Sequence, residues 1–194
     1  MPLWIAAAAC LGACVALGAY VRVHSVPALD LLASRLRGQG TPLAAFFTRL
    51  GRWYAIVLIG LLAAAAAHNA GSGVLLLELL ASQILAQGVI SRAKLFFSRA
   101  RPERWLLKLE PDLSYPSGHS ATGVVFFVPL AYLAWHVTFV PPLVADGIGA
   151  ALAICAVGLP WSRMALGAHY ATDVIGGLLF GTGWLCATVA LVTR

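Results

Sequence analysis

Residues 174–192 read VIGGLLFGTGWLCATVALV and contain no charged side chain. This run has the length of about 20 apolar residues that an α-helix needs to cross the hydrocarbon core of a bilayer. Five comparably apolar runs precede it, at approximately 2–21, 53–69, 73–91, 120–140 and 143–161. Because lipid offers the backbone no hydrogen-bond partner, we expect all of these runs to be helices. The chain is therefore predicted to be an all-α bundle of six membrane-spanning helices.

The composition of the whole chain agrees with this prediction. Hydrophobic residues make up 61% of the 194 positions and charged residues only 10%, whereas soluble domains carry about 25% charged residues. The six runs use most of the sequence, which predicts one integral-membrane domain over residues 1–194. Residues 2–21 resemble a secretory signal in their apolar character, but no Lys or Arg precedes the run, which favours an uncleaved first span.

The loop between the first two spans, residues 24–52, carries signals of short helices. Thr41 and Pro42 are typical of a helix start, with Thr41 as the N-cap, and Gly51 is typical of a helix end. Between them the apolar side chains recur at positions i, i+3, i+4 and i+7, namely Leu43, Phe46, Phe47 and Leu50. This spacing predicts an amphipathic helix lying at the membrane surface. We expect a shorter helical piece ending at Gly38, and the alternative for both segments is a loop packed on the bundle.

Basic residues are concentrated on one side of the predicted bundle. The chain has 13 Lys and Arg against 7 Asp and Glu. An even number of spans places both termini on one side, so every basic residue except Arg194 falls on the other side. A strongly basic face favours anionic partners. In an integral membrane protein, we expect the partners to be a lipid phosphate and the bilayer, and not a nucleic acid.

Three of these cations are candidates for binding a phosphate group. Lys94, Arg101 and Arg163 each lie where an apolar run ends or a loop begins. Phosphoryl transfer needs fixed cations around the non-bridging oxygens, because negative charge spreads over these oxygens in the transition state. Arg suits forked contacts and Lys suits a point contact. The alternative is that such residues are anchors whose charged ends reach the membrane surface.

A second polar stretch, Pro116-Ser117-Gly118-His119, directly precedes the fourth apolar run. The first three residues predict a turn, so the Ser117 hydroxyl and free backbone N–H groups can face an anion at a helix N-terminus. His119 is a candidate general acid that protonates the leaving oxygen. The alternative is a histidine that only caps the helix.

The third stretch contains His169 and Asp173, four residues apart. They share a face if the last helix begins early enough to include both. A carboxylate bonded to one imidazole nitrogen fixes the tautomer and leaves a lone pair on the other nitrogen. His169 is then a candidate nucleophile that forms a phosphohistidine, which water hydrolyses. The alternative is a His–Asp pair that only holds two spans together.

The three stretches together resemble a known family. Lys94-x6-Arg101-Pro102, Pro116-Ser117-Gly118-His119 and Ser162-Arg163-x5-His169-x3-Asp173 are similar to the tripartite signature of the type 2 phosphatidic acid phosphatase superfamily. The resemblance implies that His119 is the acid, His169 the nucleophile and Asp173 its partner. It also implies a reaction without a metal or other cofactor. The residues that it assigns to phosphate binding are Lys94, Arg101, Ser117, Gly118 and Arg163.

We therefore expect a membrane-embedded lipid phosphatase that acts on undecaprenyl diphosphate, phosphatidate or phosphatidylglycerophosphate through a phosphohistidine. The alternatives are a lipid phosphotransferase and a non-enzymatic transporter of anions or lipids. The resemblance implies a multi-pass protein of the inner membrane whose site faces the extracytoplasmic side. The positive-inside rule instead predicts that the basic face lies in the cytoplasm. The sequence leaves the orientation, the individual lipid and the oligomeric state open.

Overall fold

The computed structural model describes residues 2–24, 26–68, 71, 73–103, 106–107 and 111–193. Within these ranges every regular element is helical, so the predicted all-α fold is confirmed. Four long helices match four of the predicted spans, and each is long and apolar enough to cross a bilayer. They are α1 (Pro2–Val23), α5 (Gly73–Phe97), α8 (Pro142–Ala165) and α9 (Ala171–Val192).

The span predicted at 120–140 is a composite helix over Gly118–His136. It consists of α6 (Gly118–Thr122), a π-helical turn (Gly123–Phe127) and α7 (Val128–His136). Pro129 lies at the start of α7 and has no N–H to donate to the preceding turn. Wide turns of this kind are one of the ways in which a helix accommodates a local break in its hydrogen bonds.

The span predicted at 53–69 differs from a straight helix. The helix α4 (Trp53–Ala66) has 14 residues, which is too short to cross a bilayer alone. It follows α3 (Thr41–Leu50) after a bend of 61°, and the two helices pass the test for a span only as a pair. By length and apolar character, the described residues contain five helices able to cross a bilayer, and six spans if this bent pair counts as one.

Short helices in the first loop are confirmed, with one correction. The structure contains α2 (Ala28–Ala33), a 3₁₀ turn (Ser34–Leu36) and α3. The N-cap of α3 is Gly40 and not Thr41. The residue at this position has a left-handed conformation (φ +58°), which glycine adopts without strain. Thr41 is the first helical residue, and its hydroxyl donates to the Gly38 carbonyl. Packing of α3 against α8 sets the position of this helix on the bundle.

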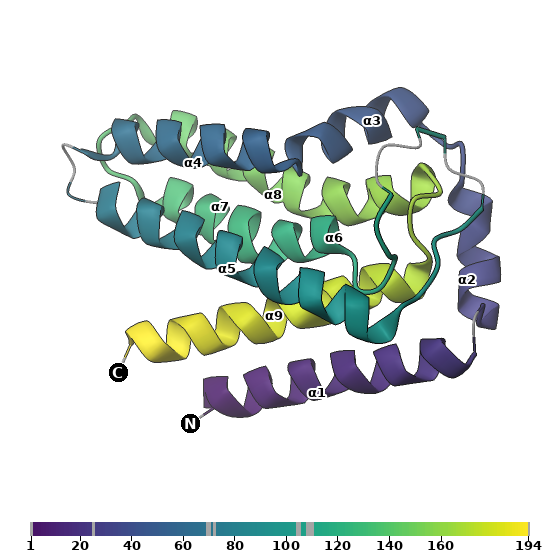
Figure 1. The fold of residues 1–194 in the computed structure, drawn as a ribbon. Helices are drawn as coiled ribbons and strands as arrows, with labels where there is room; N and C mark the ends of the chain where they lie inside the picture. Colours follow the sequence, from purple (N-terminus) through teal and green to yellow (C-terminus); the bar gives the residue numbers. More distant parts are fainter. Residues whose placement is uncertain are drawn as a thin grey trace.

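The long helices run side by side, and both termini lie at the same end of the bundle (Figure 1). The helices α2 and α3 lie at the opposite end (Figure 1). One apolar core joins α1, α5, α6 and α9, and a second joins α4, α5, α7 and α8. Many large apolar side chains on the outer surface are exposed, including Ile5, Leu58 and Leu143. Such a surface is expected of helices that face lipid.

A close helix contact joins the second and third polar stretches of the sequence. A Cβ atom added at Gly177 would overlap the carbonyl oxygen of Ser117, so glycine is needed for α9 to approach this turn. The Ser117 N–H also donates to the Asp173 carbonyl at 3.0 Å. The start of α9 is therefore fixed against the residues that precede α6.

Candidate active site

The polar stretches predicted from sequence meet at the end of the bundle that carries α2 and α3. Lys94 lies in the last turn of α5 and His119 in the first turn of α6. Arg163 lies in the last turn of α8, and Asp173 lies in the first turn of α9. His169 lies in the connection between α8 and α9. Residues from distant parts of the sequence are thus brought to one end of the fold.

A cavity of about 490 Å³ opens among these residues. One end of the cavity is polar and is lined by Lys94, Asp112, Gly118, His119 and His169. The other end lies between α4 and α5, where its apolar lining includes Ile56, Val57 and Ile84. A charged end joined to an apolar wall suits an amphipathic molecule.

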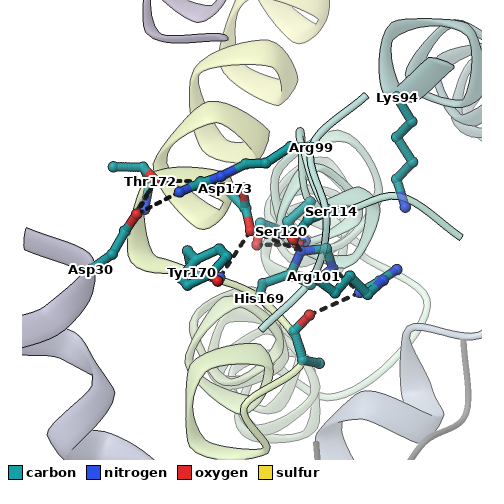
Figure 2. Close-up of polar contacts among 12 residues, drawn as sticks. Asp30, Lys94, Arg99, Arg101, Ser114, Ser120, His169, Tyr170, Thr172 and Asp173 are labelled. Atoms are coloured by element: carbon teal, nitrogen blue, oxygen red, sulfur yellow. Dashed lines mark hydrogen bonds and ion pairs between the residues drawn. The ribbon is translucent and has the colours of Figure 1, made fainter. Parts of the chain in front are cut away.

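The two nitrogens of His169 have different neighbours (Figure 2). Nε2 lies 2.9 Å from Nη1 of Arg101. Nδ1 lies 3.5 Å from Oδ2 of Asp173 and 3.3 Å from the hydroxyl of Ser114. A guanidinium can only donate hydrogen bonds, so Nε2 accepts and Nδ1 carries the proton. This tautomer leaves the lone pair of His169 on Nε2, beside the Arg101 guanidinium.

The condition under which His169 and Asp173 would share a helical face is not met. The helix α9 begins at Ala171, so His169 precedes it. The two side chains meet because Asp173, at the third helical position, caps the helix: its Oδ2 accepts from the Tyr170 N–H at 2.8 Å. This cap holds the carboxylate next to the preceding loop, where His169 lies.

Arg101 and Lys94 share one partner, Asp112. Nζ of Lys94 pairs with one carboxylate oxygen and Nη2 of Arg101 with the other. Arg101 also donates from Nε to the Asp112 carbonyl at 2.7 Å and from Nη1 to the Ala168 carbonyl at 2.9 Å. These contacts hold the Arg101 guanidinium against His169.

Arg163 and His119 are joined through Thr48 of α3. The buried guanidinium of Arg163 donates from Nη1 to the Thr48 hydroxyl. Nε2 of His119 lies 3.1 Å from the Thr48 carbonyl, which can only accept, so Nε2 carries a proton. A Cβ at Gly51 would overlap the His119 ring, so the bend between α3 and α4 must pass close to this histidine. The first loop therefore contributes to the site.

Ser117 and Gly118 differ in their exposure to the cavity. Gly118 lines the cavity. Ser117 is fully buried, and its hydroxyl accepts from the Ser120 hydroxyl at 2.9 Å.

Of the eight residues predicted from sequence, Lys94, Gly118, His119 and His169 line the cavity, and Arg101 and Asp173 flank His169. Arg163 is buried against Thr48, and Ser117 is the buried residue of the turn.

The model of the PAP2 superfamily matches residues 73–194, which include all three polar stretches. The chain belongs to the PAP2 superfamily. A crystal structure of a transmembrane PAP2 type phosphatidylglycerolphosphate phosphatase from Bacillus subtilis superposes with a TM-score of 0.76 over 96% of both chains at 23% identity, which shows a shared fold.

Two curated relatives of this PAP2 chain match shorter segments. A lipid A 1-phosphatase of Rhizobium etli is 40% identical over 81 residues, which are 41% of this chain and 29% of the relative. Phosphatidylglycerophosphatase B of Bacillus subtilis is 35% identical over 94 residues, which are 45% of this chain and 43% of the relative. The matched segments thus cover less than half of either relative.

Sequence reasoning missed a buried ionic network beside the polar stretches of this PAP2 chain (Figure 2). Nη1 of Arg99 donates to Oδ1 of Asp173 at 2.6 Å, and Nη2 donates to Oδ2 of Asp30 at 2.7 Å. Asp30 also accepts from the backbone N–H and the hydroxyl of Thr172. The Arg99 guanidinium lies 4.3 Å from the centre of the Tyr170 ring. This network ties α2 to the carboxylate that faces His169.

Two other contributors were also missed by the sequence reasoning. Ser114 donates to Oδ2 of Asp173 and lies beside Nδ1 of His169, so it helps to orient both. Thr48 contacts both Arg163 and His119. Two signals pointed toward the network: Asp30 is a lone acid in an apolar helix, and Arg99 lies two residues before Arg101 in the signature.

Proposed function

We propose that this chain is a membrane-embedded phosphatase that removes the terminal phosphate from a lipid phosphate monoester or diphosphate. The observation that carries the proposal is the placement of His169: its Nε2 lies against the Arg101 guanidinium while Nδ1 faces Asp173. The nitrogen proposed to attack phosphorus thus accepts a hydrogen bond from a cation that can hold the phosphoryl oxygens in its place. A histidine that only joined two spans would not need this cation at its second nitrogen.

In the proposed reaction, Nε2 of His169 attacks phosphorus in line with the bond to the lipid oxygen. A P–N bond forms, the P–O bond breaks, and the lipid leaves as an alcohol or as a lipid monophosphate. Lys94, Arg101 and Arg163 are proposed to neutralise the non-bridging oxygens, together with the turn at Ser117 and Gly118. Asp173 stabilises the positive charge that develops on the imidazole. Water then breaks the P–N bond and releases inorganic phosphate.

His119 is proposed to move the protons in both steps. It gives a proton to the leaving oxygen in the first step and takes one from the attacking water in the second. Because Nε2 is hydrogen-bonded to the Thr48 carbonyl, Nδ1 is the nitrogen that exchanges the proton. The contact with Thr48 therefore fixes which side of the ring faces the reaction.

The shape of the cavity supports a lipid as the substrate. Its polar end carries Lys94, His119 and His169, and its apolar end lies between α4 and α5. A headgroup phosphate at the polar end would leave the attached chain against the apolar wall. The relatives named lipid A 1-phosphatase and phosphatidylglycerophosphatase B agree with a lipid phosphate as the substrate class. Undecaprenyl diphosphate, phosphatidate and phosphatidylglycerophosphate are the individual substrates that we propose to test.

The experiment that tests this function is phosphate release from these three lipids by the purified protein in detergent, with a metal chelator present. We expect free phosphate from at least one lipid at a rate that the chelator does not change. A phosphorylated acceptor lipid in place of free phosphate would show a phosphotransferase instead. Loss of turnover on chelation would overturn the metal-independent reaction, and no phosphate from any lipid would overturn the phosphatase assignment.

We also propose that the protein lies in the inner membrane with this site on the extracytoplasmic face, as the family resemblance implies. The excess of basic residues on this face is compatible with either side, because anionic headgroups attract basic residues. Glu103 is exposed and lines a pocket together with His169, and Thr193 is exposed at the C-terminal end of α9, away from the site. In intact spheroplasts, a membrane-impermeant maleimide should label Glu103→Cys and leave Thr193→Cys unlabelled. The reverse pattern would place the site in the cytoplasm.

A further inference from the structure

Asp112 lies at the polar end of the cavity, between two cations of the site. Its two carboxylate oxygens pair separately with Nζ of Lys94 and Nη2 of Arg101. The side chains of Lys94 and Arg101 are 11% and 7% exposed, whereas that of Asp112 is 50% exposed. The carboxylate therefore covers two nearly buried cations from the open side. We call the pair Lys94 and Arg101 the anion cradle.

The position of this carboxylate resembles that of a bound phosphoryl group. Two oxygens of one anion contact the two cations of the anion cradle, as two non-bridging oxygens of a phosphate would. Arg101 at the same time contacts Nε2 of His169 through Nη1. A phosphoryl group placed for attack by His169 would approach Nη2 of Arg101 and Nζ of Lys94 from the open side, which the Asp112 carboxylate covers. The two anions would also repel each other there, so we expect the substrate to displace Asp112.

Asp112 carries its charge under all ordinary conditions. Partial burial raises the pKa of its carboxyl group, but the contacts with Lys94 and Arg101 lower it more strongly, so that the pKa falls to about 2. Between pH 5 and 9, in the absence of substrate, the anion cradle therefore holds a singly charged anion that is tethered to the chain. A tethered group competes at a high effective concentration.

Lipid anions differ in their ability to displace such a competitor. A phosphate monoester, or the terminal phosphate of a diphosphate, carries about −1.5 to −2 charges at pH 7 and three terminal oxygens. A phosphodiester headgroup has one charge and two terminal oxygens, like the carboxylate, but it lacks the tether. The bilayer around the protein presents phosphodiesters at high local concentration, so an open anion cradle would be occupied by them.

We propose that Asp112 determines specificity by acting as an internal anion that phosphate monoesters and terminal phosphates displace and phosphodiester headgroups do not. The proposal rests on the proposed phosphatase function. It assigns to Asp112 no part in bond making or breaking. Its effect is on the binding of anions, so it changes KM and inhibition rather than the chemical step.

The test compares the wild-type protein with Asp112→Asn, and with Glu103→Gln as the matched control. Glu103 is an exposed carboxylate of the same loop that makes no ion pair with any described residue. Phosphate release from phosphatidate is measured in mixed micelles with increasing phosphatidylglycerol, a phosphodiester. For Asp112→Asn we expect a lower KM for phosphatidate. We also expect phosphatidylglycerol to inhibit at a concentration about tenfold lower than for the wild type, because the variant loses two partly exposed ion pairs that compete with the headgroup. Glu103→Gln should behave as the wild type does.

Binding measured without turnover separates this proposal from the proposed function. Calorimetry with inorganic phosphate and with dimethyl phosphate gives the preference of the site for the monoester type of anion. This preference should be reduced at least about fivefold in Asp112→Asn. Unchanged preference, or a higher KM with unchanged inhibition by phosphatidylglycerol, would show that Asp112 only orients the anion cradle and would overturn the proposal. If the wild type binds phosphate with this preference but hydrolyses no lipid, the proposed function fails and the role of Asp112 stands.

Discussion

The substitution His169→Asn is expected to lower the rate of phosphate release by about 10⁴-fold or more, the scale seen when a catalytic nucleophile is removed. Asparagine retains a polar group near Asp173 but has no nitrogen lone pair to attack phosphorus. Loss of the proposed nucleophile would act on the chemical step, so kcat should fall while the binding of inorganic phosphate persists. The rate is measured as phosphate released per purified protein in detergent.

A matched control is available in His136, an exposed histidine at the end of α7 that contacts the Tyr132 carbonyl. His136→Asn should retain the wild-type rate. Quenching the wild-type reaction in alkali, where phosphohistidine is stable, should trap a phosphorylated protein, and His169→Asn should trap none. A variant of His169 that still turned over at the wild-type rate would refute the assignment of the nucleophile.

Hydropathy predicts which segments lie in the membrane but not whether each is one straight helix. The apolar run at 53–69 suggested a span, yet α4 ends at Ala66 and depends on α3 across a bend of 61°. An apolar run indicates that a segment favours lipid, whereas a bend in a helix depends on how the neighbouring helices pack. Here His119 packs against Gly51, in the bend between α3 and α4. That contact joins residues 68 positions apart and has no signal in the local sequence.

The motif residues could be predicted because their chemistry is encoded in short patterns. His169 and Asp173 are four residues apart, and the sequence alone indicated that they meet, although the reason is a helix cap and not a shared face. The role of Asp112 could not be predicted in this way, because a single acidic residue in a loop forms no recognisable motif. Its proposed role depends on ion pairs with two cations, which lie 18 and 11 residues before it in the sequence. Long-range partners of this kind are visible only once the chain is folded.

Arg99 is the clearest case of a residue whose importance only the fold reveals, and its loss should strongly destabilise the protein. Its side chain is 4% exposed, and the two carboxylates that it joins, those of Asp30 and Asp173, are 0% exposed. Removing one partner of a buried ion pair leaves an uncompensated charge, which costs about 3–5 kcal/mol. We expect Arg99→Met to lower the free energy of unfolding in detergent by this amount.

Three further variants separate the charge of Arg99 from its packing. Arg22→Met removes an exposed arginine that contacts only the Phe96 backbone and ring among the described residues, so its unfolding should stay within about 0.5 kcal/mol of the wild type. Adding Asp30→Asn to Arg99→Met removes one of the two uncompensated charges and should recover part of the loss. Arg99→Lys keeps the charge but not the forked guanidinium that contacts both carboxylates, so it should be more stable than Arg99→Met and still release phosphate more slowly than the wild type.

If Arg99→Met unfolded like Arg22→Met, the network would contribute nothing to stability. Its contact with Asp173 would then have to be explained by catalysis alone.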